Sequence, residues 1–130
     1  LSLMTETRDT RQKKIIEGEM LKNKFFFTAE ALYDNVLKID KSIGIATVYR
    51  FLKELRKNRQ IHAYVCNRKS LYSLKNMNHC HFTCESCGKV EHIRVENIDF
   101  IKKFIEGDIC HFQVEVSGLC SACKKRNIYK

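Results

Sequence analysis

Two pairs of cysteines in the sequence have the spacing of metal ligands. Cys84 and Cys87 form one C-x-x-C pair, and Cys120 and Cys123 form another near the end of the chain. Each pair presents two thiolates on a short turn, so two such turns can close a tetrahedral zinc site without an open position. Two unrelated pairs of buried or redox-active cysteines are the alternative. The doubled spacing favours a structural zinc site made of all four sulfurs.

A second group of possible ligands precedes the first C-x-x-C pair. His79 and His81 flank Cys80, and alternate side chains of a strand share one face, so the two imidazoles are expected to project together. Paired imidazoles suit borderline divalent metals. The other candidate ligands are two histidines and three cysteines: His62, His92, Cys66, Cys80 and Cys110. This arrangement predicts a second, regulatory metal site.

The composition is that of a folded protein. Of 130 residues, 44% are apolar and 30% are charged, which is enough for a hydrophobic core. No stretch approaches the roughly 18 uninterrupted apolar residues that a membrane span needs, so no membrane partner is expected. The odd count of seven cysteines, with no basic leader and apolar run at the start, indicates reduced thiols in a cytoplasm.

The positive charge is concentrated in the first part of the chain. Residues 1–75 carry 16 basic and 8 acidic residues, a net charge of +8, whereas residues 76–130 carry 8 and 7, a net charge of +1. Six of the seven cysteines and four of the five histidines lie in the second range. We therefore expect two domains, 1–75 and 76–130. The first domain is expected to bind an anionic partner, and nucleic acid is favoured over a membrane. The alternative is that its basic residues only form a solvated surface.

Helical spacing of apolar residues predicts three helices in the first domain. The three stripes are Ile15, Ile16, Met20 and Leu21; Ala29, Leu32, Tyr33, Val36 and Leu37; and Ile45, Val48, Leu52 and Leu55. Thr28 is the expected N-cap of the second helix. Short strand-like runs at 61–65 and 71–74 surround a polar, basic turn and predict a hairpin. Three helices followed by a basic hairpin describe a winged helix-turn-helix.

In a winged helix-turn-helix the third helix enters the major groove of double-stranded DNA, and basic residues hold phosphates. Near the start of the third helix, Thr47, Tyr49 and Arg50 are the candidates for contacting base edges. The candidates for contacting phosphates are Lys13, Lys53, Lys57, Arg68 and Lys69. The alternative is a three-helix core that touches no nucleic acid, with Tyr49 as a packing residue.

The second domain is expected to be a small α/β layer. We predict a strand at 89–93, a helix at 97–106 and another strand through 112–116. The helix is expected to bury four apolar residues: Ile98, Ile101, Phe104 and Ile105. Because this layer has too little area to be stable alone, it is predicted to pair with a second copy and form a homodimer.

Three segments occur in an order that is typical of one protein family. They are Ile45-Ala46-Thr47-Val48-Tyr49-Arg50, the run from His79 to Val90 with both histidines and the first C-x-x-C pair, and Gly118-x-Cys120-x-x-Cys123. Segments 10–13 and 28–33 are similar to the opening and the second helix of the same family. Together they resemble the ferric uptake regulator (Fur) family of metal-responsive repressors. The resemblance implies an α+β chain: an N-terminal winged helix-turn-helix, then a small α/β dimerisation domain with a four-cysteine zinc site. It also implies a sensory metal between the domains.

The sequence departs from the family pattern at the sensory site. Phe27 occupies a position that often holds a histidine ligand, and Ser73 or a neighbour replaces a carboxylate. Cys80 and His92 also stand where acidic residues are common. The chain therefore offers nitrogen and sulfur rather than oxygen, which disfavours iron and favours zinc or nickel as the second divalent metal. The position of His62 resembles a ligand position of zinc-sensing relatives.

These observations predict a homodimeric, metal-responsive transcriptional regulator, with repression of metal-homeostasis or oxidative-stress genes as its expected role. Alternatives of the same fold are a thiol-redox switch using the cysteines outside the four-sulfur site, and a constitutive DNA-binding protein. The alternatives from other classes are a zinc-ribbon RNA-binding module and a zinc or thiol enzyme. An enzyme is disfavoured because the chain has no H-E-x-x-H arrangement. The sequence therefore predicts a regulator without a catalytic site.

Overall fold

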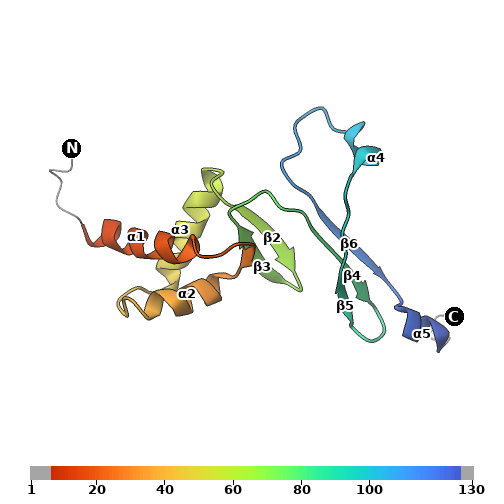
Figure 1. Cartoon of the computed structure of the whole chain (residues 1–130), viewed down its shortest axis with the longest axis horizontal. Helices are drawn as coiled ribbons and strands as arrows, with labels where there is room; N and C mark the ends of the chain where they lie inside the picture. The colour runs from red at the N-terminus through yellow and green to blue at the C-terminus, as the bar shows by residue number, and fades with distance from the viewer. Residues whose placement is uncertain (1–6, 127–130) are drawn as a thin grey trace. The chain divides into compact units, whose positions relative to one another are not determined.

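The chain forms two compact units, Leu1–Asn76 and Met77–Lys130. The computed structural model describes residues 7–126, and each unit is described by itself (Figure 1). The opening residues 1–6, on which the expectation of no leader rests, lie outside this range. Within residues 7–126, no helix combines the length and the apolar character that crossing a bilayer requires.

The first unit begins with three helices, as the apolar stripes predicted. They are α1 (Arg8–Met20), α2 (Ala29–Leu37) and α3 (Ile45–Lys57). Thr28 caps α2, because its side-chain oxygen accepts a 3.1 Å hydrogen bond from the amide of Ala31. Such a cap satisfies one of the amides that the first helical turn leaves without a partner. The cap therefore fixes where α2 begins.

A small sheet completes the first unit. The hairpin strands β2 (His62–Cys66) and β3 (Lys69–Ser73) are antiparallel, and the two-residue strand β1 (Phe26–Phe27) adds to the free edge of β3. The turn residues Asn67 and Arg68 have positive φ angles of 51° and 65°. Positive φ at both central residues gives a turn whose twist matches a β-hairpin. The hairpin was predicted from the sequence, whereas the strand β1 was not.

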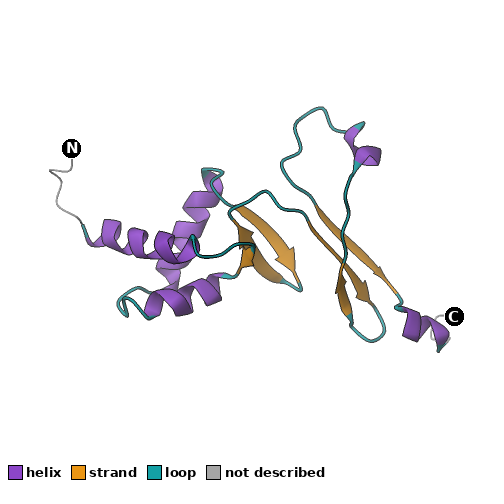
Figure 2. Ribbon diagram, viewed as in Figure 1, coloured by secondary structure: helices purple, strands orange, loops and turns teal. Residues whose placement is uncertain are grey.

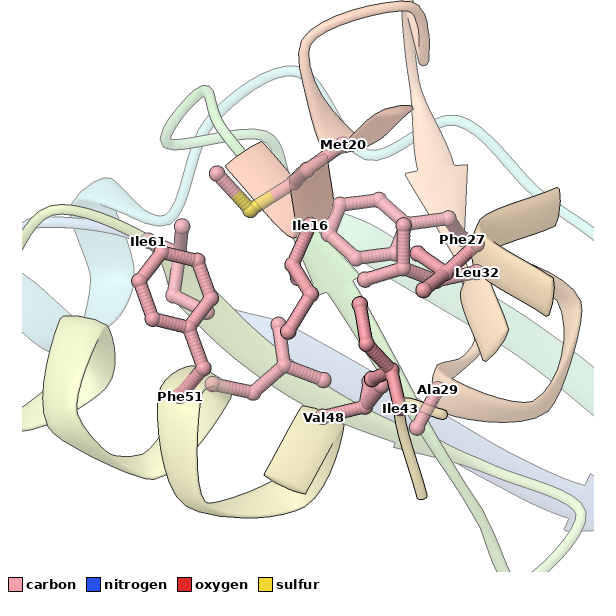
Figure 3. Packing of buried hydrophobic residues seen from close by; sticks show 11 residues of the cluster. Ile16, Met20, Phe27, Ala29, Leu32, Ile43, Val48, Phe51 and Ile61 are labelled. Carbon is pink, nitrogen blue, oxygen red and sulfur yellow. The ribbon is translucent and has the colours of Figure 1, made fainter. Parts of the chain in front are cut away.

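The core of the first unit lies between the helices and the sheet (Figure 3). Val48 and Leu52 are fully buried, but Ile45 is 38% exposed and Leu21 is 60% exposed. These two were wrongly assigned to the core, because each stands at a helix end, where the apolar stripe no longer faces the other helices. Phe51 is buried instead of Ile45, because it lies on the same helical face as Val48 and Leu52.

A three-stranded sheet forms the second unit. The central strand β4 (His79–Cys84) is antiparallel to β5 (Val90–His92) on one side and parallel to β6 (Gln113–Gly118) on the other. Two short helices, α4 (Asp99–Lys102) and α5 (Ser121–Lys125), accompany it (Figure 2). The parallel pairing places the ends of β4 and β6 at the same edge of the sheet.

The predicted helix at 97–106 is only one turn long. After Lys102, the amides of Phe104 and Ile105 bond to carbonyls three residues back rather than four. This tighter turn moves both side chains off the face that carries Ile98. The expectation that they are buried was wrong within a single chain: Phe104 is 77% exposed and Ile105 is 44% exposed.

Candidate functional site

Both C-x-x-C pairs come together at one edge of the second unit. The register of β4 and β6 places Cys84 opposite Gly118, so the turn after β4 lies beside the turn that leads into α5. The four sulfurs of Cys84, Cys87, Cys120 and Cys123 all lie within 4.8 Å of one another. The sulfurs of Cys87 and Cys120 are 3.8 Å apart. The four residues singled out by their spacing are therefore close enough to share one ion.

The surroundings of these sulfurs favour negative charge at one of them. The amides of Cys120 and Cys87 donate to the Cys84 sulfur at 3.3 and 3.5 Å, and these bonds lower the pKa of Cys84 to about 6. For Cys123, a hydrogen bond from Ser86 lowers the pKa, but bonding to Cys120, burial and the other thiols outweigh it and raise the pKa to about 11. Without a cation, the cluster therefore resists ionising all four thiols.

Three imidazoles form a second cluster within the same unit. His79 and His81 lie on one face of β4, as their alternation predicted, and His92 of β5 is directly opposite His81. The ring centroids are 5.5 Å apart for His79 and His81, 5.3 Å for His79 and His92, and 6.2 Å for His81 and His92. Burial, and then repulsion from the other two imidazoles, lowers the pKa of His79. A neutral imidazole is the form that binds a metal.

A carboxylate that was not predicted from the sequence also faces this cluster. Glu115 of β6 is paired in register with His81, and its carboxylate oxygen lies 3.6 Å from Nε2 of that residue. The other nitrogen of His81, Nδ1, is buried and has no hydrogen-bond partner among residues 7–126. Only the register of the parallel strands reveals this neighbour, and the sequence carries no direct signal for that register.

The remaining candidate ligands have varied surroundings. His62 begins β2 in the first unit and is half-buried. Cys66 is half-buried, Cys80 is buried and Cys110 is exposed. Phe27, where relatives were expected to carry a histidine, is a core residue stacked on Tyr72 with ring centroids 5.9 Å apart. The position therefore has a packing role in this chain.

The first part of α3 presents the side chains predicted to contact bases. Arg50 is exposed and its guanidinium donates a 3.1 Å hydrogen bond to the Thr47 hydroxyl. Tyr49 is 41% exposed, and its hydroxyl donates a 2.5 Å hydrogen bond to the carboxylate of Glu30 on α2. This bond lowers the pKa of Glu30 and raises the pKa of Tyr49. Glu30 is a second neighbour that was not predicted from the sequence.

A groove of about 410 Å³ lies between the start of α2, the start of α3 and the hairpin. Arg68 and Lys69, at the hairpin tip, line it together with Glu30 and Tyr49. Lys53 and Lys57 are exposed further along α3. Lys13 differs from these four basic residues, because its ammonium group lies 3.5 Å from carboxylates of both Asp9 and Glu54. Part of its charge is therefore neutralised within the unit.

The fold and these sites define a class: a winged-helix protein joined to a second unit that carries four cysteines close enough to hold one ion and a cluster of three imidazoles. The sequence model of the ferric uptake regulator family matches residues 4–116, and the chain belongs to this family. Its members are transcription regulators and not enzymes, which confirms the prediction of a regulator without a catalytic site. The chain is accordingly a metal-responsive, DNA-binding transcriptional regulator.

Comparison with known proteins gives distant relatives over nearly the whole chain. The peroxide-responsive repressor PerR of Staphylococcus epidermidis is 24% identical over 123 residues, which are 91% of this chain and 82% of the relative. Among solved structures, the Helicobacter pylori ferric uptake regulator Fur has a TM-score of 0.57 at 20% identity, covering 88% of this chain and 80% of its own. The Campylobacter jejuni peroxide stress regulator has a TM-score of 0.54 at 23% identity, covering 89% and 91%. These structures bear out the α+β fold.

Proposed function

We propose that the protein is a homodimeric repressor whose sensor is the cluster of three imidazoles in the second unit. The observation that carries this proposal is the convergence of His79, His81 and His92 on one face of the sheet, beside a separate four-sulfur cluster. The two clusters have different chemistry and are suited to different tasks. A sulfur cluster closed by four protein ligands holds its ion permanently and stabilises the fold. A cluster of three nitrogen ligands binds its metal ion reversibly and so responds to the concentration of that metal in the cell.

Zinc is the proposed ion of the four-sulfur cluster. Four thiolates without an open position are the donor set of structural zinc, and the cation would offset the bonding among the thiols and the burial that raise the pKa of Cys123. In this chain Cys84, Cys87, Cys120 and Cys123 would hold the ion.

Two of the three separations between the imidazole rings are close to the value expected for rings that share one ion. A metal–nitrogen bond of about 2.0 Å, extended to the centre of the ring, places an imidazole centroid roughly 3.2 Å from the ion. Two such rings at a tetrahedral angle then have centroids about 5 Å apart. The measured 5.3 and 5.5 Å agree with this distance, and the third separation of 6.2 Å is somewhat wider. As the side chains stand, these three residues do not form a group of described residues whose ligand atoms all lie within 4.8 Å of one another, so a shared ion requires His92, which is exposed, to turn toward the other two.

Nitrogen donors select the metal. Phe27 is committed to the hydrophobic core, and Ser73 is fully buried with its hydroxyl accepting a 3.2 Å hydrogen bond from the amide of Lys75. Neither adds a carboxylate or an imidazole to the donor set. An imidazole-rich set favours zinc or nickel over iron and manganese, so we propose one of these two as the sensed metal, with His62 as a further candidate ligand.

We assign DNA binding to the first unit, which corresponds to the domain predicted at residues 1–75. Thr47, Tyr49 and Arg50 are proposed to contact base edges, because they lie in the first two turns of α3 and Tyr49 lines the groove. The proposed phosphate contacts are Lys13, Lys53, Lys57, Arg68 and Lys69. The operator is double-stranded DNA with two half-sites, since a two-fold dimer carries two copies of α3.

Dimerisation is assigned to the second unit, residues 76–130. Several large apolar side chains of this unit are exposed in a single chain: Ile93, Phe100, Phe104, Ile105 and Val116. Exposed apolar area of this extent is removed from water when two copies meet. A cytoplasmic location follows from the same proposal, because the operator and reduced thiols are found there.

A pair of variants tests the function. The double variant His79→Ala and His81→Ala should keep the zinc of the sulfur cluster and lose the metal dependence of operator binding in a gel shift at fixed salt. Arg50→Ala should do the opposite, keeping both metals and weakening operator binding by about 1–3 kcal/mol. Metal-dependent binding that survives in the double variant would remove the imidazoles from sensing. Unchanged binding by Arg50→Ala would remove α3 from the interface.

A further inference from the structure

We propose that Glu115 is the positioning carboxylate of the sensor, and that it makes Nδ1 of His81 the metal-binding nitrogen. This inference rests on the proposed function of the imidazole cluster and goes beyond it by assigning an atom and a supporting residue. All the residues involved belong to the second unit.

The strand register places three polar side chains in one row across the sheet. His81 of the central strand β4 is opposite His92 of β5 on one side and opposite Glu115 of β6 on the other. Directly opposite residues of neighbouring strands point to the same face of a sheet. His79 lies two positions before His81 and so shares that face. The sensor face therefore carries three imidazoles and one carboxylate.

The two nitrogens of His81 have different surroundings. Nε2 lies 3.6 Å from the carboxylate oxygen of Glu115, whereas Nδ1 is buried and without a hydrogen-bond partner in the described chain. The residue as a whole is 2% exposed. A neutral imidazole carries one proton, and the negative charge of Glu115, 3.6 Å from Nε2 and slightly beyond hydrogen-bond distance, favours that proton on Nε2, so Nδ1 is left with a bare lone pair. A buried acceptor without a partner is costly, and a bound metal would satisfy it.

Glu115 itself is not expected to bind the same ion. Its side chain is 66% exposed, and it approaches the ring from the side of Nε2, away from the lone pair of Nδ1. The arrangement is instead the carboxylate–histidine–metal sequence, in which the carboxylate fixes the tautomer and raises the basicity of the ligand. The ligands of the ion are then three neutral imidazole nitrogens, and the negative charge of Glu115 contacts the ligand His81 rather than the ion itself.

The first measurement reads the tautomer directly. In protein loaded with zinc only at the sulfur cluster, long-range ¹⁵N–¹H NMR correlations should show His81 with its proton on Nε2. Glu115→Ala should shift the population toward the Nδ1 proton, and Glu115→Gln, whose amide oxygen still accepts a hydrogen bond, should retain the Nε2 proton. A wild-type His81 with its proton on Nδ1 would overturn the inference.

The second measurement reads metal affinity. Zn²⁺ binding at the second equivalent, in competition with a chelator, should weaken 10–100-fold in Glu115→Ala and less in Glu115→Gln. Glu91→Ala is the matched control: this exposed carboxylate of β5 pairs with Lys89 at 2.9 Å and is opposite Phe82, on the other face. It should leave the affinity unchanged. Wild-type affinity in Glu115→Ala would refute the positioning role while leaving the sensor intact, whereas no second equivalent in the wild type would refute both proposals.

Discussion

Replacing Phe27 by histidine should damage the first unit instead of restoring a metal ligand. Phe27 is 4% exposed, stacks on Tyr72 and belongs to the main core. An imidazole at this position gives up part of the apolar burial of the phenyl ring, roughly 1–2 kcal/mol. It also places ring nitrogens in a site built for an apolar ring, which adds about 1–3 kcal/mol. We therefore expect Phe27→His to lower the free energy of unfolding by about 3 kcal/mol.

Urea unfolding followed by far-ultraviolet circular dichroism measures this change, since the chain contains no tryptophan. A loss of this size is a large share of the 5–15 kcal/mol that is typical of a folded domain. Phe27→Leu is the matched control and should cost about 1 kcal/mol, because it keeps an apolar side chain of similar volume. A histidine variant as stable as the leucine variant, or one that gains a further equivalent of zinc, would refute the assignment of Phe27 to packing alone.

Three further predictions concern charge, pH and assembly. Glu30→Gln removes a negative charge from the basic groove while leaving an acceptor for Tyr49, so operator affinity should rise a few-fold at low salt and less at high salt in gel shifts. Metal-free protein should lose stability as the pH falls below about 6.5. Burial lowers the pKa of His79 in the folded state, so the unfolded chain takes up a proton at this residue first. The midpoints of urea unfolding at about pH 8 and about pH 5.5 measure the loss. Equal midpoints would contradict it. Phe104→Ser should shift the protein toward monomer in sedimentation velocity without a loss of zinc.

Much of the architecture could be predicted from local patterns. The helical spacing of Val48 and Leu52, the Thr28 cap and the hairpin all depend on neighbours within a few residues, and the structure contains each of them. The same is true of the shared face of His79 and His81, because alternation along a strand needs no knowledge of the rest of the fold. Errors arose where an element ends, as at Leu21, Ile45 and Phe104.

The sequence by itself determined the ligand types and their short spacing: two C-x-x-C pairs, and two histidines one residue apart. Only the tertiary structure decided which distant groups meet them. The parallel pairing of β4 and β6 brings Cys120 to Cys84 and places Glu115 beside His81. The packing of α2 against α3 likewise places Glu30 at the hydroxyl of Tyr49. Such neighbours depend on strand register and helix packing, which arise from burial summed over the whole core and not from any short segment.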